Sequence, residues 1–223
     1  MTRRLILVRH GVTGWNREGR FQGHRDPPLA EEGKVEAALL AARIAFDPEL
    51  RPMRIVASPL QRALDTAREM AAAAAGDIPL APDARLMEIG QGEWEGRTHA
   101  ELAVDDAERY RAWRARAGEE QPPGAEPLDA AYERVATVLA DLVAAEAWPT
   151  CVVSHGGTLR LAARYLLRLP GRRAWALDLD NASISSLVAV EDRWRLERWN
   201  DTAHLLGRTP QHVDEAEGEP LAL

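Results

Sequence analysis

Short apolar runs alternate along the chain with segments whose apolar residues recur at helical spacing. The runs are typical of buried strands and cover Arg3–His10, Arg54–Ala57, Ile78–Leu86 and Thr150–Ser154. The helical patterns cover Glu32–Phe46, Ser58–Gly76, Thr98–Arg116, Asp129–Glu146 and Gly157–Leu169. Ser183–Val190 and Trp194–Trp199 form a predicted hairpin near the C-terminus. This alternation predicts an α/β fold, a three-layer α/β/α sandwich around a mostly parallel central sheet.

Local signals set the expected helix starts and one functional loop. Ser58, with Gln61 as its capping-box partner, predicts the N-cap of the second helix. Asp129 predicts the N-cap of the long amphipathic helix. The segment Gly11–Pro28 is rich in Gly, Asn, Arg and Pro, so we expect a loop there. Loops of this length usually carry function.

The helical segment that begins at Thr98 has a sparse apolar face. Thr98 and Glu101 form a capping box, and Arg, Glu and Ala dominate the residues that follow. The prolines of Gln121–Gly124 end this segment. A helix of this kind suits a surface element that lies over something, so we expect a small helical lid at about residues 92–125.

Composition narrows the class of protein. The chain has 223 residues, a formal charge of −7 and a single cysteine, Cys151, which we expect on a buried strand. We expect one domain over residues 1–210 and a mobile acidic tail over 211–223. The acidic balance argues against nucleic-acid binding, and no stretch approaches the ~20 apolar residues of a membrane helix. These features predict a cytoplasmic protein without a membrane partner.

Two predicted strands end in a histidine followed by glycine, as Val8-Arg9-His10-Gly11 and Val153-Ser154-His155-Gly156. Ligands of α/β sheets bind beyond the carboxyl ends of the strands, and glycine lets a ligand approach closely. A structural histidine and a metal ligand are alternative interpretations of each pair. Arg9 disfavours a cation beside His10, and no cysteine cluster or HExxH motif completes a metal site. An anion is therefore the favoured ligand.

The wider string around His10, Leu7-Val8-Arg9-His10-Gly11-Val12-Thr13-Gly14-Trp15-Asn16, resembles the signature of the histidine phosphatase superfamily, which includes phosphoglycerate mutases and many small phosphatases. The resemblance extends over roughly Arg3–Leu206 and includes Arg20–Asp26, Ser58–Ala67, Leu86–Gly96, Val153–Gly157, Asn181–Ser185 and Asn200–Leu205. Departures are small. Val12 replaces a usual acidic residue, and a family Pro-Gly-Gly-Glu-Ser turn is altered by Ala125 and Pro127.

The resemblance implies catalysis through a phosphohistidine. The chemistry is reasonable, because neutral imidazole is a good nucleophile near pH 7. By resemblance, His10 attacks phosphorus, His155 stabilises charge on the transferring group, and Glu88 protonates the leaving group and then activates water. Arg9 and Arg62 would bind the nonbridging oxygens, since a guanidinium fork matches phosphate geometry. Further substrate-binding donors are expected from Asn16, Gln22, Gly23 and Gly156. Neither a cofactor nor a metal ion is required by this scheme.

Phosphatase action on a small phosphate monoester is the favoured function, with two alternatives. The family's mutases carry a long insertion after a Pro-Pro pair, whereas Pro122 and Pro123 run almost directly into the predicted helix at Asp129. Tyr110–Arg116, by contrast, resembles the lid in which mutases place paired arginines. We therefore predict a phosphoric monoester hydrolase. Phosphoglycerate mutase-type transfer is the first alternative, and a noncatalytic phosphate-binding module is the second.

Substrate identity and oligomeric state are less constrained by the sequence. An acidic substrate is one interpretation of the lid arginines, and solvation of an exposed helix is the other; these residues are Arg97, Arg109, Arg111, Arg114 and Arg116. A homodimer through a sheet edge or through the tryptophan-rich C-terminal hairpin is one hypothesis for the assembly.

Overall fold

The centre of the computed structural model, which describes residues 3–73, 78–115, 120–145, 147–171, 173–191 and 193–207, is a mixed β-sheet. Within these residues the sheet has six strands in the order β3-β2-β4-β1-β5-β6. Their bounds are β1 Arg4–Arg9, β2 Arg54–Ala57, β3 Leu80–Pro82, β4 Thr150–Ser154, β5 Ile184–Val190 and β6 Arg193–Asp201. β1 to β4 are parallel, and β5 is antiparallel to β1 and β6. The expected tail, residues 211–223, lies outside the described residues.

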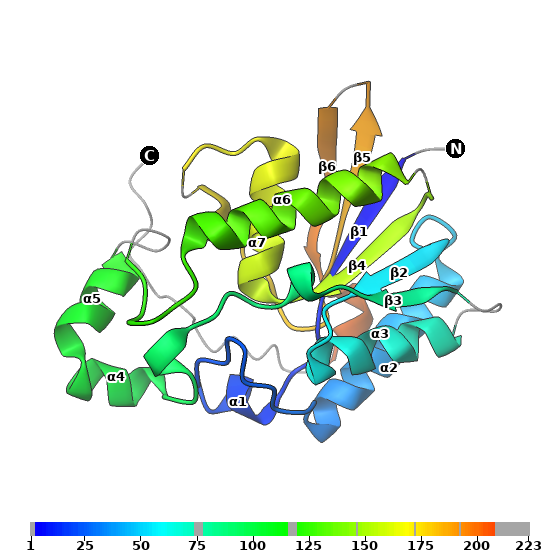
Figure 1. The fold of residues 1–223 in the computed structure, drawn as a ribbon. Helices are drawn as coiled ribbons and strands as arrows, with labels where there is room; N and C mark the ends of the chain where they lie inside the picture. Colours follow the sequence, from blue (N-terminus) through cyan, green and yellow to red (C-terminus); the bar gives the residue numbers. More distant parts are fainter. Residues whose placement is uncertain are drawn as a thin grey trace.

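Helices cover both faces of this sheet (Figure 1). One face carries α2 (Glu31–Phe46) and α3 (Gln61–Ala73), and the other carries α6 (Leu128–Ala144) and α7 (Gly156–Leu167). Three-residue and four-residue 3₁₀ turns lie at Ala84–Leu86, Gly92–Trp94, Arg173–Ala176 and Ala203–Leu205. The α/β fold predicted from the sequence is therefore confirmed.

The central strand β1 shows why its sequence is a continuous apolar run. Leu5 and Leu7 belong to the core beneath α6 and α7, whereas Ile6 and Val8 belong to the core beneath α2 and α3. Side chains alternate between the faces of a strand, so a strand covered on both faces needs apolar residues at every position. Cys151 of β4 is fully buried in the second core, as expected, and its burial raises the pKa of the thiol.

Two predicted helix starts are wrong in detail. α3 begins at Gln61, and the Gln61 amide donates to Asp26 (2.8 Å) rather than closing a capping box with Ser58. The hydroxyl of Ser58 instead accepts from the amide of Leu60 (3.3 Å). The N-cap of α6 is Pro127, and Asp129 lies in the first turn, where its charge complements the helix dipole.

Three other segments differ from the sequence-based expectation. The loop after β1 contains a short helix, α1 (Gly14–Arg17), because Thr13 and Asn16 close a capping box. The predicted strand at 78–86 is shorter, because the Asp83 side chain accepts from the Arg85 amide and starts a 3₁₀ turn. The predicted lid helix is two helices, α4 (His99–Asp105) and α5 (Ala107–Ala115). The predicted capping box at Thr98 is confirmed.

The lid region has a small core of its own, separate from the two cores of the sheet. Its described residues are 92–115 and 120–125, and Figure 1 places α4 and α5 at one end of the molecule beside α1. The Trp94 indole N–H donates to Asp106 at the break between the helices (2.9 Å). Aromatic and apolar side chains fill this core, namely Phe21, Trp94, Leu102, Tyr110 and Trp113.

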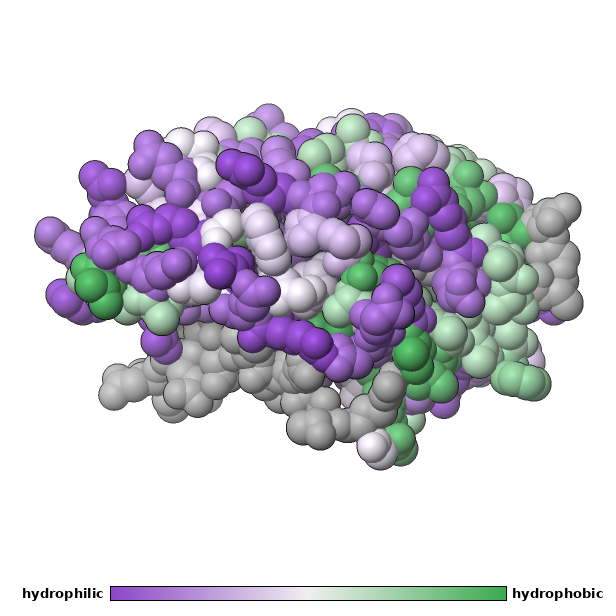
Figure 2. Space-filling view, turned by 90° about the horizontal axis from the view of Figure 1, so that it is seen from below, coloured by the Kyte–Doolittle hydropathy of each residue, from purple (hydrophilic) through white to green (hydrophobic). Residues whose placement is uncertain are grey.

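The surface beneath the molecule is mostly hydrophilic on the lid side and carries apolar patches toward α2 and α3 (Figure 2). Exposed apolar residues of α2 include Val35, Leu39 and Phe46. Among the helices of the described residues, none combines the length and apolar character that a bilayer crossing requires.

We predict that Gly33→Ala destabilises the fold, because the loop after β1 crosses the first turn of α2 backbone to backbone. A Cβ at Gly33 would lie 2.0 Å from the carbonyl oxygen of Val12. Overpacking of this kind costs about 1–3 kcal/mol of the free energy of unfolding, measurable by urea denaturation. Gly14→Ala is the control, since a Cβ there meets nothing within 4 Å. Equal stability of the two variants would contradict the prediction.

Candidate active site

The register of β1 and β4 places the two histidines side by side at the carboxyl edge of the sheet. Arg9 pairs with Ser154, and the amide of His10, the next residue, donates to the Ser154 carbonyl (3.0 Å). The imidazole rings of His10 and His155 have centroids 5.1 Å apart and planes inclined by 60°. Both rings are buried. The predicted meeting of these histidines is therefore present in the structure.

Hydrogen bonding sets the tautomer of His10, and burial with the neighbouring charges keeps the ring neutral. Its Nδ1 lies 2.7 Å from the carbonyl oxygen of Gly11, which can only accept, so Nδ1 carries the proton. Burial, together with the charges of Arg62 and Arg9, holds the pKa of His10 well below its usual 6.5. The ring is consequently neutral at pH 7 with a lone pair on Nε2, the form that can act as a nucleophile.

The His155 ring is hydrogen-bonded to Ser58, which follows the neighbouring strand β2. The Ser58 hydroxyl lies 2.8 Å from Nε2 of His155 and already accepts from the amide of Leu60. The hydroxyl can also donate its own hydrogen to Nε2, and in that arrangement the ring proton lies on Nδ1. That Nδ1 is buried and has no hydrogen-bond partner among the described residues. In this tautomer His155 holds an uncommitted donor beside His10.

Two arginines supply the positive charge of the site. Arg9 donates to the carbonyl of Leu179. Arg62, in the first turn of α3, donates to the carbonyls of Gly23 (3.0 Å) and Arg25 (2.8 Å) and so shapes the loop that carries Gly23. Burial lowers the pKa of Arg62 to about 10, so its guanidinium is charged at neutral pH.

Glu88 lies at the N-terminus of α7. Its carboxylate accepts from the amides of Gly157 (3.1 Å), Thr158 (3.0 Å) and Ile89 (2.9 Å). The unpaired amides and the dipole of a helix N-terminus favour a carboxylate in this place. A Cβ on Gly157 would lie 2.7 Å from Oε1 of Glu88, so glycine makes room for it.

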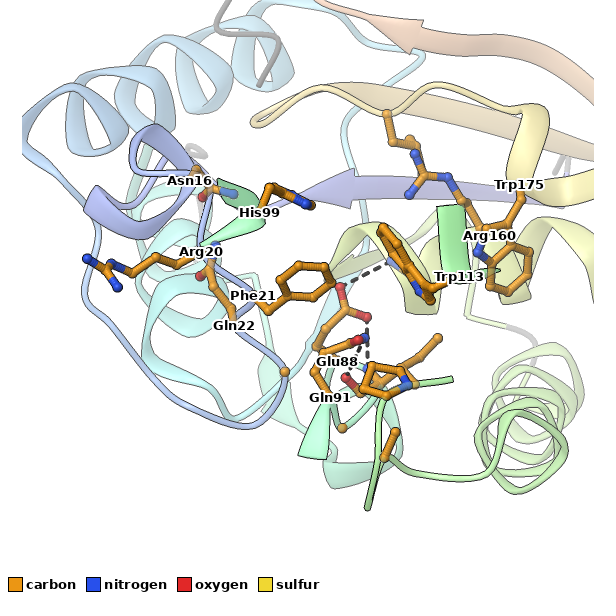
Figure 3. Close-up of a pocket in the computed structure, with 18 of the residues that line it drawn as sticks. Asn16, Arg20, Phe21, Gln22, Glu88, Gln91, His99, Trp113, Arg160 and Trp175 are labelled. Carbon is orange, nitrogen blue, oxygen red and sulfur yellow. Dashed lines mark hydrogen bonds between the residues drawn. The ribbon is translucent and has the colours of Figure 1, made fainter. Parts of the chain in front are cut away.

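A pocket of about 270 Å³ opens over these groups. Figure 3 shows Glu88 in the middle of its lining, with Asn16 and Gln22 on one side and Arg160 and Trp175 on the other. The predicted site residues that line it are Arg9, His10, Asn16, Gln22, Gly23, Arg62 and Glu88. Two predicted residues lie behind this lining. They are His155, beside His10, and Gly156, where an added Cβ would lie 3.6 Å from Cζ of Arg9.

The loop donors are held in place by Thr13. The Asn16 side-chain oxygen accepts from the Thr13 amide (3.0 Å), and the Gln22 oxygen accepts from the Thr13 hydroxyl (3.2 Å). Each side chain therefore has its NH₂ group left as a donor for a ligand. Gly23 has φ +51°, and a Cβ there would lie 2.1 Å from Oε1 of Glu95, so only glycine fits.

Sequence reasoning missed several pocket residues, including Arg20, Arg160, Trp175, Asp178 and Asp180. Arg160 could have been found, because it lies four residues after Gly156 and therefore on the same face of a helix that starts at the site. Of the lid arginines in the described residues, only Arg114 lines the pocket. Arg97 pairs with Asp105, and Arg116 lies outside the described residues.

No group of three or more His, Cys, Asp or Glu side chains that could hold a metal ion occurs within the described part of the chain. The donors that converge on the pocket are instead guanidinium, imidazole and amide N–H groups. Such groups bind an anion with tetrahedral oxygens well.

Comparison with known proteins agrees with this arrangement. A model of the histidine phosphatase superfamily (branch 1) matches residues 5–202. The chain belongs to this superfamily. The match includes both histidines and, apart from Arg4 at the start of β1, every strand of the described sheet, so the resemblance stated from the sequence is confirmed.

Similar proteins include enzymes with different named substrates. Glucosyl-3-phosphoglycerate phosphatase of Mycobacterium tuberculosis is 34% identical (91% of this chain, 96% of that protein). Phosphoserine phosphatase 1 of Hydrogenobacter thermophilus is also 34% identical (91% and 94%), and a probable phosphoglycerate mutase of an Enterobacter species is 36% identical (90% and 94%). A structure of the mycobacterial glucosyl-3-phosphoglycerate phosphatase with VO₃ superposes with a TM-score of 0.79, at 34% identity over 90% of this chain and 100% of that one.

We predict that the free energy of unfolding falls as the pH is lowered through the range in which exposed histidines titrate. Burial keeps the native pKa values of His10 and His155 low, so at mildly acidic pH the unfolded chain binds more protons than the native state does. Each histidine contributes a slope of up to about 1.4 kcal/mol per pH unit below about pH 6.5. Urea denaturation between about pH 7.5 and about pH 5.5 measures this slope. The double variant His10→Asn/His155→Asn should show a shallower slope, and an unchanged slope would contradict the assignment.

Proposed function

We propose that this protein hydrolyses a small phosphate monoester through a phosphohistidine on His10. The observation that carries the proposal is a neutral His10 with its Nε2 lone pair in the same pocket as two charged guanidiniums and a carboxylate. Its phosphatase relatives act in the same class of reaction. The sequence-based prediction of a phosphoric monoester hydrolase agrees with them.

In the first half-reaction, Nε2 of His10 attacks phosphorus while the bond to the leaving oxygen breaks. Glu88, acting as the general acid, delivers a proton to that oxygen, so the alcohol departs neutral. Arg9, Arg62 and the Nδ1–H of His155 stabilise the charge on the transferring oxygens. In the second half-reaction, Glu88 takes a proton from water as the water attacks phosphohistidine. Inorganic phosphate leaves, and both His10 and Glu88 return to their starting states.

The chain connection after the lid favours hydrolysis over mutase transfer. Residues 124–127 alone separate Pro123 from α6, so the long insertion of the family's mutases is absent. A mutase must keep water away from phosphohistidine, and a shorter cover over the pocket does this less well. Mutase-type transfer stays the alternative, since Arg114 of the lid lines the pocket. A noncatalytic module is disfavoured, because all the predicted catalytic residues are present.

We predict that the protein releases phosphate from p-nitrophenyl phosphate in the presence of EDTA and that His10→Ala does not. The substitution removes the nucleophile, while the arginines that bind phosphate remain. Phosphate release is measured together with the acid-labile, base-stable phosphoryl group on the wild-type chain, located by mass spectrometry. Turnover by His10→Ala would remove the covalent mechanism.

The choice between phosphatase and mutase is tested by incubating the protein with 3-phosphoglycerate and bisphosphoglycerate and measuring both phosphate release and formation of 2-phosphoglycerate. Phosphate release faster than formation of the 2-isomer is the expected result for a phosphatase. Isomerisation that outpaces release would overturn the choice between the two functions.

We propose further that the substrate carries a carboxylate beside its phosphate. Arg160 lines the pocket, and its Nε donates to the carbonyl of Leu177 (2.9 Å), while Arg9 is held by Leu179 of the same segment. A Cβ on Gly156 would lie 3.3 Å from Nη1 of Arg160 and 3.6 Å from Cζ of Arg9, so both guanidiniums lie against one backbone position. Phosphoglycerates and phosphoserine, which two relatives' names mention, both carry such a carboxylate.

We predict that Arg160→Met lowers kcat/KM for 3-phosphoglycerate or phosphoserine by roughly 10- to 100-fold, as expected for a lost charge-assisted hydrogen bond. Turnover of glycerol phosphate, which has no carboxylate, should change little. Steady-state kinetics on these esters and on phosphoethanolamine measure the selectivity. Equal losses of kcat/KM for all esters would contradict the carboxylate proposal. So would a wild-type preference for glycerol phosphate or phosphoethanolamine. Neither result would bear on the phosphohistidine mechanism.

The assembly and the cellular location stay predictions. β6 forms one edge of the described sheet, as the homodimer hypothesis through a sheet edge requires. A cytoplasmic location remains an expectation from composition.

A further inference from the structure

The backbone that carries Glu88 has an unusual source of hydrogen bonds. Residues 87–91 lie between the 3₁₀ turns Ala84–Leu86 and Gly92–Trp94 and pair with no strand of the described sheet. Buried or half-buried backbone carbonyls need donors, and a segment outside helix and sheet must find them elsewhere. Side chains of other elements supply these donors.

Arg134 of α6 supplies two of them and a third to the adjacent carbonyl of Arg85, while Thr158 and His24 supply one each, to Met87 and Glu88. Its Nη1 donates to the carbonyls of Arg85 (2.7 Å) and Met87 (2.8 Å), and its Nη2 donates to the carbonyl of Glu88 (3.2 Å). The guanidinium is largely buried, with 18% of the side chain exposed. One planar group therefore fixes three carbonyls around the residue that the mechanism uses for proton transfer.

Glu126 binds both Arg134 and Gly90, near the other end of residues 87–91; we call the Arg134–Glu126 pair the clamp. Its carboxylate accepts from Nε (2.6 Å) and Nη2 (2.8 Å) of Arg134 and from the amide of Gly90 (3.2 Å), and its own amide donates to the Gly90 carbonyl (2.9 Å). Burial by itself would raise the pKa of Glu126, but the hydrogen bonds and charge of Arg134 hold it below its ordinary value. Arg134 and Glu126 thus form a bidentate ion pair that packs against residues 87–91.

The carboxylate of Glu88 is held separately by the amides of Gly157 and Thr158 at α7. Glu88 is therefore fixed at two ends. Its backbone carbonyl is held by Arg134 of α6 (3.2 Å) and by Nε2 of His24 (2.9 Å), and its carboxylate is held by α7. Proton transfer requires the carboxyl oxygen within hydrogen-bond reach of the leaving oxygen, and a displacement of ~1 Å at a catalytic group can cost ~100-fold in rate. Arg134 itself does not line the pocket, so any effect on catalysis passes through Glu88.

We propose that Arg134, locked by Glu126, is the positioning residue for Glu88 and sets the geometry of proton transfer to the leaving group. The proposal rests on the phosphohistidine mechanism above and concerns one half of it, the protonation of the departing oxygen. The phosphoryl group is bound directly by Arg9, Arg62 and His155. Arg134 acts on His155 through its charge, as the least of the causes that lower the pKa of that imidazole.

The test exploits the fact that leaving groups differ in their need for a proton. Departing p-nitrophenolate needs little protonation, whereas an alkoxide leaves as the alcohol. For Arg134→Met we expect kcat/KM for an alkyl phosphate to fall roughly 10- to 100-fold more than kcat/KM for p-nitrophenyl phosphate. The ratio of the two constants reports phosphorylation of His10 alone, because kcat/KM excludes the later hydrolysis. The Kd of vanadate should stay within about 3-fold of the wild-type value, since the phosphate-binding groups are untouched.

Arg85→Met is the matched control. Arg85 lies in the 3₁₀ turn just before residues 87–91. Its side chain pairs with Asp83 and Asp141 and gives no hydrogen bond to residues 87–91 in the described structure. This variant should keep the wild-type ratio. Glu126→Gln, which loses the charge and keeps the shape, should shift the ratio in the same direction as Arg134→Met, and it decides the question if Arg134→Met does not fold.

Equal losses on both substrates, or an unchanged ratio in Arg134→Met and Glu126→Gln, would overturn the positioning role. Failure of the wild-type protein to hydrolyse p-nitrophenyl phosphate would overturn the proposed function itself, so the two failures are distinguishable.

Discussion

The parallel pairing of β1 with β4 is the constraint on which the site depends. Because Arg9 lies opposite Ser154, the residues that follow, His10 and His155, leave the sheet at the same level. β2 is the next strand on the other side of β4, so Ser58 emerges beside His155. A slip of one residue in either pairing would turn every side chain of the strand to the opposite face and separate the rings.

The second constraint is electrostatic. Two buried imidazoles lie next to two guanidiniums, and burial, reinforced by these positive charges, lowers the pKa values of both rings and keeps them neutral. The protein tolerates the arrangement because each guanidinium also donates to backbone carbonyls, as Arg62 does to Gly23. A phosphate dianion would supply the missing negative charge, so the same crowding that lowers the pKa of His10 also creates affinity for the substrate.

The sheet and the convergence of Arg9, His10, Arg62 and Glu88 on one pocket could be predicted because their signals are local. An apolar run followed by Arg9-His10-Gly11 is readable without the fold, and Arg62 and Glu88 lie in strings with family resemblance. The start of α3 could not be predicted, since the Gln61 amide bonds to Asp26, a residue far away in the chain. The same holds for Arg134, because a side chain that bonds to carbonyls of a distant segment leaves no periodic or spacing signal in the sequence.

Cys151, the only cysteine of the chain, is fully buried, and the raised pKa of its thiol leaves almost no thiolate. Oxidants and alkylating reagents therefore have no accessible sulfhydryl to attack, and a histidine nucleophile does not require one. A cysteine introduced at the surface can therefore be labelled selectively without removing Cys151. A cysteine introduced at Val104 of α4, where 79% of the side chain is exposed, would be the one reactive thiol, and a fluorophore attached there would report movements of the α4–α5 region during turnover.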